Sequence, residues 1–165
     1  MSTVTRILGI DPGFDRTGFG VVDQRGSDAT WIAHGCIQTH AGLEFAQRLK
    51  IVRDELKQLL DLHQPQCVAV EELFFQNNAK TAIKVGMARG VVILTLADAG
   101  VKIVELTPNQ VKQGIAGWGG ADKKQVQGMV QRVLKLKDIP KPDDAADALA
   151  IAIVGGMLYK REQLS

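Results

Sequence analysis

The stretch RILGIDPGFDRTGFGVVDQRGSDATWIAHGCIQ, residues 6–38, decides the fold. It predicts three short strands, at Arg6–Asp11, Thr17–Asp23 and Thr30–Gln38, separated by Pro-Gly and Gly-Ser turn signals. Because the connections are short, we expect the three strands to pair antiparallel as a meander. Such a sheet must bury its apolar faces against other elements, which the rest of the chain has to supply.

Downstream of the meander, helical and strand patterns alternate. The spacing predicts a helix over Leu43–Leu62, a doubly buried strand at Cys67–Val70, a helix over Asn78–Ala99 and a strand at Lys102–Leu106. The apolar stripe expected on the first helix consists of Leu43, Ala46, Leu49, Val52, Leu56, Leu59 and Leu60. Helices that connect successive strands in this way are typical of parallel crossovers.

Three helices complete the chain. One begins at Thr107-Pro108, and two more are predicted over Ala121–Lys135 and Asp144–Tyr159. The polar end, 159–165, is expected to fray. No internal repeat or boundary interrupts the pattern, so we expect residues 1–165 to form a single domain.

The predicted fold class is α/β, with a mixed five-stranded sheet and helices on both faces. Three of its strands are antiparallel and two are added in parallel. The first strand should lie centrally, with the fourth parallel beside it, so that the carboxyl ends of both strands meet at one edge. Ligands of open α/β sheets bind at such edges.

Acidic residues gather at that edge. Asp11 closes the first strand and Glu71 closes the fourth, while Asp144 and Asp147 lie one turn apart on the last helix. A single acid at a strand end is usually a turn former or helix cap, and Asp143 needs no other explanation. Four acids brought together repel one another unless a cation lies between them.

Carboxylates without nearby His or Cys favour Mg²⁺ or Mn²⁺ over zinc. Four such ligands suffice for two ions per subunit, which can assist in-line displacement at a phosphodiester. We therefore expect Asp11, Glu71, Asp144 and Asp147 to be both the metal ligands and the catalytic residues, with Mg²⁺ as the cofactor and Mn²⁺ as a substitute. In this hypothesis, the carboxylate of Asp11 binds both Mg²⁺ ions.

Charge and composition limit the function classes. Residues 77–137 hold ten Lys or Arg against three Asp or Glu, a net charge of +7, so the other residues sum to −5. This polarity suits a protein that binds a polyanion, although solvated helix faces also produce it. No apolar run is long enough to cross a membrane, and MSTVTR is not a secretory signal, so we expect a cytoplasmic protein without a membrane partner.

Four blocks carry a family resemblance. They are LGIDPGFDRTGFGVV (8–22), VAVEELFFQNNAKTAIKVGMARG (68–90), LTPNQVKQGIAGWGGADKKQVQ (106–127) and DDAADALAIA (143–152). In this order and spacing they resemble the RuvC family of bacterial Holliday-junction resolvases, over about residues 6–155. The resemblance implies an RNase H-like (retroviral integrase superfamily) fold.

The resemblance also implies an activity in DNA recombination and repair. Members are homodimeric endonucleases that nick two strands of like polarity symmetrically across a four-way junction and leave 5′-phosphate ends. The catalytic acids carried over are Asp11, Glu71, Asp144 and Asp147. Glu71 is followed by a second acid, Glu72, which alternation along the strand should send to the opposite face. Association with the RuvA and RuvB branch-migration complex is implied as well.

Residues expected to contact DNA follow from the same blocks. Phe74 would stack on bases, although its ring could instead pack in the core. Lys112 and Lys123 would neutralise phosphates near the metals, although isolated lysines are mostly solvated. The remaining candidates form a basic track on the second helix: Lys80, Lys84 and Arg89. The dimer patch expected on that helix consists of Ala82, Ile83, Gly86, Met87 and Gly90.

Three other functions remain open at this point. An RNase H-type nuclease acting on another nucleic-acid structure would need the same acids. GIDPGFDRTG (9–18) also resembles the phosphate loop of actin-like nucleotide-binding proteins, which need two lobes around the nucleotide. A catalytically inactive junction binder is the third, but it gains nothing from acids placed against phosphates.

Overall fold

The computed structural model describes residues 3–72 and 78–165. Its elements follow the predicted order of three strands, helix, strand, helix, strand and three helices. They are β1 (Thr5–Asp11), β2 (Arg16–Arg25), β3 (Asp28–Gln38), α1 (Phe45–His63), β4 (Cys67–Glu71), α2 (Ala79–Asp98), β5 (Lys102–Leu106), α3 (Pro108–Ala116), α4 (Lys123–Val133) and α5 (Asp143–Gln163).

The strands form one mixed sheet in the order β3-β2-β1-β4-β5. β1 pairs antiparallel with β2 and parallel with β4, while β2–β3 is antiparallel and β4–β5 is parallel. In the parallel register Ile10 lies beside Val70, so Asp11 and Glu71 end neighbouring strands at the same edge. The predicted central position of the first strand and its pairing with the fourth are confirmed.

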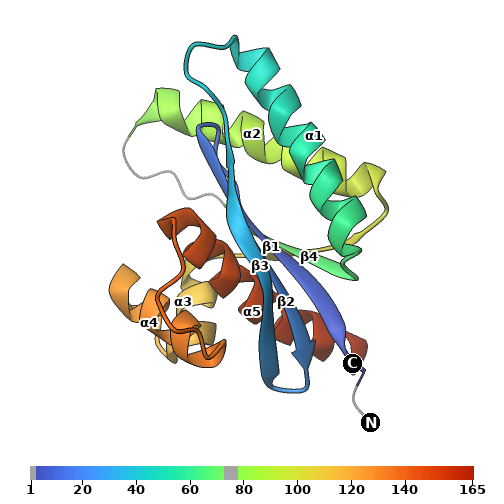
Figure 1. Cartoon of the computed structure of the whole chain (residues 1–165), viewed down its shortest axis with the longest axis vertical. Coiled ribbons are helices and arrows are strands. Elements are labelled where there is room, and N and C mark those ends of the chain that lie inside the picture. Colours follow the sequence, from blue (N-terminus) through green and yellow to red (C-terminus); the bar gives the residue numbers. More distant parts are fainter. Residues whose placement is uncertain (1–2, 73–77) are drawn as a thin grey trace.

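Helices cover both faces of the sheet (Figure 1). α1 and α2 lie on one face, and α5 lies on the other with α3 and α4 packed beside it. Alternation along β1 divides the core accordingly: Leu8 and Ile10 pack with Val52 and Val92 under α1 and α2, whereas Ile7 belongs to the cluster with α5. The predicted two-sided α/β arrangement is confirmed.

Glycines let α5 lie directly on the two central strands. A Cβ atom at Gly9 of β1 would overlap the carbonyl oxygen of Ala148, and one at Gly18 of β2 would overlap the carbonyl oxygen of Asp144. Any larger residue at either position would push the helix away from the sheet. The close approach brings the first turns of α5 to the end of β1.

The structure corrects the predicted buried face of α1. The helix begins at Phe45, and its buried residues are Arg48, Val52, Leu56 and Leu60. Leu43 and Ala46, which the sequence pattern placed on the stripe, are exposed. The helix begins two residues later than predicted, and the position one turn before Val52 is taken by an arginine that binds a neighbouring loop.

The C-terminal helix is longer than predicted. α5 continues to Gln163, so the expected end of the helix at Tyr159 is wrong, while Leu164 and Ser165 lie beyond it. An ion pair of 3.1 Å between Glu162 of α5 and Lys102 of β5 links this last turn to the sheet. Among the described residues, no helix has both the length and the apolar character needed to span a bilayer.

Candidate metal centre

Three aspartates meet at the edge of the sheet predicted from the sequence. Asp11 ends β1, and Asp144 and Asp147 lie one turn apart at the start of α5. One carboxylate oxygen from each residue can be chosen so that all three lie within 4.8 Å of one another. Hard oxygen donors at this separation are a ligand set for a divalent cation.

Glu71 lies beside this trio without belonging to it. It ends β4, next to Asp11, and shares the wall of a pocket of about 260 Å³ with Asp147 and Lys112. Burial and then the negative charge of Asp147 raise the pKa of Glu71 to about 7, although the ammonium group of Lys112 opposes this shift. The glutamate therefore faces the same negative region as the aspartates.

The cluster concentrates negative charge that two lysines, Lys112 and Lys123, offset only in part. Burial raises the pKa of Asp11 well above its usual range, and the nearby carboxylates of Glu71, Asp147 and Asp144 raise it further. Burial also raises the pKa of Asp147, against the opposing charge of Lys123. Groups perturbed in this way by both desolvation and like charge are typical of functional sites.

Two lysines reach the cluster from the basic part of the chain. Lys123 is the first residue of α4, which a capping box between Asp122 and Gln125 begins. Its ammonium nitrogen lies 3.4 Å from a carboxylate oxygen of Asp143 and 3.6 Å from one of Asp147. Lys112 of α3 lines the pocket with Glu71. Both lysines therefore lie beside the carboxylates, and their predicted contact with DNA phosphates stays a prediction.

The basic residues predicted on α2 lie in different surroundings. Arg89 donates from Nε to the carbonyl oxygen of Glu71 (3.3 Å), and its guanidinium pairs with Glu105 of β5. It thus holds the end of β4. The ammonium group of Lys84 lies 5.6 and 5.8 Å from the centroids of two aromatic rings, those of Phe14 and Phe45.

The last two DNA-contact candidates are Lys80 and Phe74. Lys80 lies exposed in the first turn of α2, next to the capping residue Asn78. Phe74 lies outside the described residues. The predicted contacts of both with DNA therefore stay predictions.

Sequence analysis missed the role of Arg48. Its side chain is buried and donates to Thr39 Oγ1 (2.9 Å) and to the carbonyl oxygen of Phe14 (3.2 Å), and it pairs with Asp15. These contacts hold the loop that follows Asp11. A signal was present, because a charged residue one helical turn before Val52 lies in line with the apolar stripe of α1.

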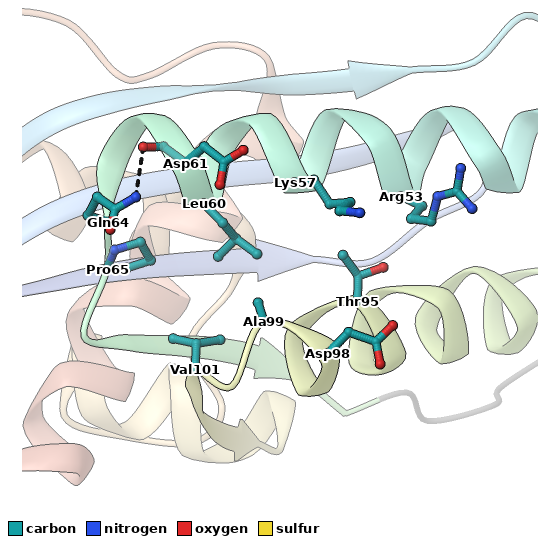
Figure 2. A pocket seen from close by; sticks show the side chains of 10 residues that line it. All are labelled: Arg53, Lys57, Leu60, Asp61, Gln64, Pro65, Thr95, Asp98, Ala99 and Val101. Atoms are coloured by element: carbon teal, nitrogen blue, oxygen red, sulfur yellow. Dashed lines mark hydrogen bonds between the residues drawn. The ribbon is translucent and has the colours of Figure 1, made fainter.

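A second pocket of about 420 Å³ lies between the C-terminal halves of α1 and α2 (Figure 2). Two basic residues, Arg53 and Lys57, and two acidic residues, Asp61 and Asp98, line it together with apolar side chains. None of the four candidate carboxylates lines this pocket. Although this pocket is larger than the one beside Glu71, it lacks the carboxylates that the predicted metal chemistry needs.

Comparison with known proteins shows to which family this chain belongs. The profile of the family "Crossover junction endodeoxyribonuclease RuvC" matches residues 7–155. The chain belongs to the RuvC family. The RuvC protein of Brevibacillus brevis is 53% identical over 148 residues, covering 90% of this chain and 89% of that protein. The RuvC protein of a Roseiflexus species is 51% identical over 151 residues, covering 92% and 90%.

Solved structures agree with the family assignment. The structure described as Thermus thermophilus RuvC in complex with Holliday junction substrate superposes with a TM-score of 0.89 at 37% identity, covering 96% of both chains. The fold of the present chain is therefore the RuvC fold, an RNase H-like arrangement. The yeast mitochondrial resolvase Ydc2 shares the fold, with a TM-score of 0.65 at 14% identity. The aspartate cluster of this family member could hold a metal ion.

Proposed function

We propose that this member of the RuvC family is a metal-dependent endonuclease that resolves Holliday junctions by paired, symmetric nicks. The observation that carries the proposal is the convergence of Asp11, Asp144 and Asp147 within 4.8 Å of one another, with Glu71 beside them. The RuvC relative solved with a Holliday junction, which shares the fold over nearly its whole length, supports the choice of substrate.

The chemistry of the donor set fits Mg²⁺, with Mn²⁺ as a substitute. The carboxylates of Asp11, Glu71, Asp144 and Asp147 are hard donors. Burial and neighbouring carboxylates raise the pKa of Asp11 and of Glu71, and a bound cation would oppose this shift by favouring the charged form. Two ions bound there would activate a water for attack on phosphorus and stabilise the leaving 3′ oxygen.

The protein's own residues supply position and charge. The sheet and α5 hold the four carboxylates in place, and Arg89 anchors the carbonyl group of Glu71. Lys123 and Lys112 lie at the rim of the pocket, where their positive charges would hold phosphates of the scissile strand. Hydrolysis in which water attacks phosphorus and the bond from phosphorus to the 3′ oxygen breaks would leave 5′-phosphate and 3′-hydroxyl ends.

Symmetric cleavage requires two sites related by a two-fold axis, so we propose a homodimer. α2 offers a face for it: the side chains of Ile83, Met87 and Leu94 are 64%, 49% and 62% exposed. Outside the helix's own backbone, no atom of residues 3–72 and 78–165 lies within 4 Å of a Cβ built at Gly86 or Gly90, so a second copy of the helix could approach there closely. A monomer in sedimentation at micromolar concentration, with and without junction DNA, would contradict the dimer.

Cellular context follows from the same proposal. The cysteines Cys36 and Cys67 are free thiols, as a reducing cytoplasm favours. A junction-resolving enzyme would act there together with the RuvA and RuvB branch-migration complex, which stays a prediction from the family resemblance.

The decisive experiment compares substrates. Purified protein and Mg²⁺ are incubated with a mobile four-way junction, a linear duplex of the same sequence and an RNA–DNA hybrid, and the nicks are mapped on each labelled strand. We expect paired nicks at equivalent positions on two strands of like polarity, with ligatable ends. Cleavage of the hybrid but not of the junction would instead support an RNase H-type nuclease.

A further inference from the structure

An exposed tryptophan lies in the glycine-rich segment between α3 and α4. Trp118 is 54% exposed, although burying an aromatic side chain of this size is strongly favourable. Gly117 precedes it in the left-handed conformation (φ 85°) and ends α3. The ring is therefore presented to solvent by a turn that only a residue without a side chain adopts easily.

The loop holds the ring in place. A Cβ atom at Gly120 would lie 2.8 Å from Cε3 of Trp118, so the indole packs directly on the glycine backbone. One at Gly119 would lie 3.0 Å from Cγ of Asn109, so the loop packs against the first turn of α3. A ring fixed on one side and open on the other loses little conformational entropy when it binds a partner.

The loop borders the metal centre. Ala121 and Asp122, which follow it directly, line the pocket that contains Glu71 and Asp147. Lysines lie on both sides in sequence, Lys112 on α3 and Lys123 on α4, and Lys123 contacts Asp147. Trp118 therefore lies between the two lysines in sequence, on the loop that leads into this pocket.

The second tryptophan provides a contrast. Trp31 of β3 donates from Nε1 to Nδ1 of His34 (2.9 Å) and packs edge-on against the same ring. The pocket that Trp31 lines is formed with His34 and residues 136–141, and neither Lys112 nor Lys123 lines it. Trp31 is thus a matched control with similar exposure, 41%, and a different environment.

We infer that Trp118 is a stacking platform for a base of the DNA strand held at the carboxylates. The inference rests on the proposed function and names a contact within it. Every base offers a flat face, so such a platform adds affinity without demanding a sequence. It would act on a base that is unstacked at the branch point, and less on a continuous duplex.

Two measurements test it. First, the W31F protein keeps Trp118 as its single tryptophan, and its emission is followed during titration with a four-way junction without divalent cations, so that no cleavage occurs. We expect quenching that saturates with binding. Second, junction affinity is measured by anisotropy for W118A, W118F and W31A. We expect W118A to weaken binding about 5- to 100-fold, W118F to recover part of the loss, and W31A to match the wild type.

The outcomes separate the inference from the proposed function. If the W31F protein binds the junction with unchanged Trp118 emission, or W118A binds it as tightly as the wild type, the inference is overturned while the nuclease proposal stands. If the wild type neither binds nor cuts junctions, both fail. Loss of dimer in W118A would place the ring at a protein interface and would also overturn the inference. The emission test needs no change at Trp118, so it holds even if W118A misfolds.

Discussion

The two ends of β1 carry charge in opposite ways. At its start, the guanidinium of Arg6 makes two hydrogen bonds of 2.8 Å to the carboxylate of Asp23, which lowers the pKa of that carboxyl group. At its end, Asp11 faces Glu71, Asp144 and Asp147, and its pKa is raised instead. One strand thus has a compensated ion pair at one edge of the sheet and a set of like charges at the other.

The difference indicates which end was built for stability and which for function. A carboxylate paired with a guanidinium stabilises the fold. Its charge is already neutralised, so it needs no bound cation. Four carboxylates gathered with too few cations reduce the stability of the metal-free protein, so their convergence needs an explanation outside the fold. A bound divalent cation supplies one, because it converts the repulsion into coordination.

The largest expected effect comes from neutralising the end of β1. Asp11→Asn should lower the rate of junction cleavage by about three orders of magnitude, as loss of an essential catalytic carboxylate does, while leaving junction binding largely intact. Asp23→Asn, the matched change at the other end, should leave cleavage nearly unchanged and lower the free energy of unfolding by about 1 kcal/mol. Single-turnover cleavage and denaturant unfolding measure both. Full activity in the Asp11→Asn protein would remove the assignment.

Addition of Mg²⁺ or Mn²⁺ should stabilise the folded protein by binding at the carboxylates beside the end of β1. At a cation concentration about 100 times the dissociation constant, the gain is about 2.7 kcal/mol, visible as a rise in Tm. Asp147→Asn should reduce this gain, because it removes a ligand, and Arg6→Gln should not. An equal rise in all three proteins would show that the cations act elsewhere.

The pH dependence of stability should differ between the two ends. For Glu71, whose pKa is raised from 4.5 to about 7, the folded metal-free protein retains a proton that the unfolded chain has lost. Stability should therefore fall as pH rises from 4.5 to 7 and then level off, and Glu71→Gln should flatten this slope. Asp23, with a lowered pKa, contributes stability above its ordinary pKa of 3.8 that is lost as pH falls below it. Urea unfolding across pH 3–9 measures both limbs, and an unchanged slope in Glu71→Gln would contradict the first.

The smallest expected effect is the loss of a single lysine at either end of the strands, measured as the salt dependence of DNA binding. Lys123, 55% exposed, pairs with Asp143 and Asp147, whereas Lys102, 51% exposed, pairs with Glu162 at the opposite edge. Lys123→Ala should reduce the slope of log affinity against log salt by about one and slow cleavage, and Lys102→Ala should change neither. Equal slopes for both variants and the wild type would count against a phosphate contact at Lys123.

Much of the fold could be predicted because its signals are local. Pro-Gly after Asp11, the unalternating run before Glu71 and the Thr107-Pro108 helix start each identify an element from a few neighbouring residues. The predictions failed where the bounds or buried face of a helix depend on a contact with residues far away in the sequence. The start of α1 and its buried residues depend on the loop that Arg48 binds, and the last turn of α5 is linked to β5 through Glu162.

The sequence by itself determined the order of the elements and put an acid at the end of two strands and at the start of one helix, because turn, cap and periodicity signals act between neighbours. Only the tertiary structure decided that three of these acids lie within 4.8 Å of one another, that Lys123 reaches two aspartates and that Arg89 binds the carbonyl group of Glu71. The physical reason is packing. How closely α5 approaches the sheet depends on contacts such as those at Gly9 and Gly18, which join segments more than 120 residues apart along the chain.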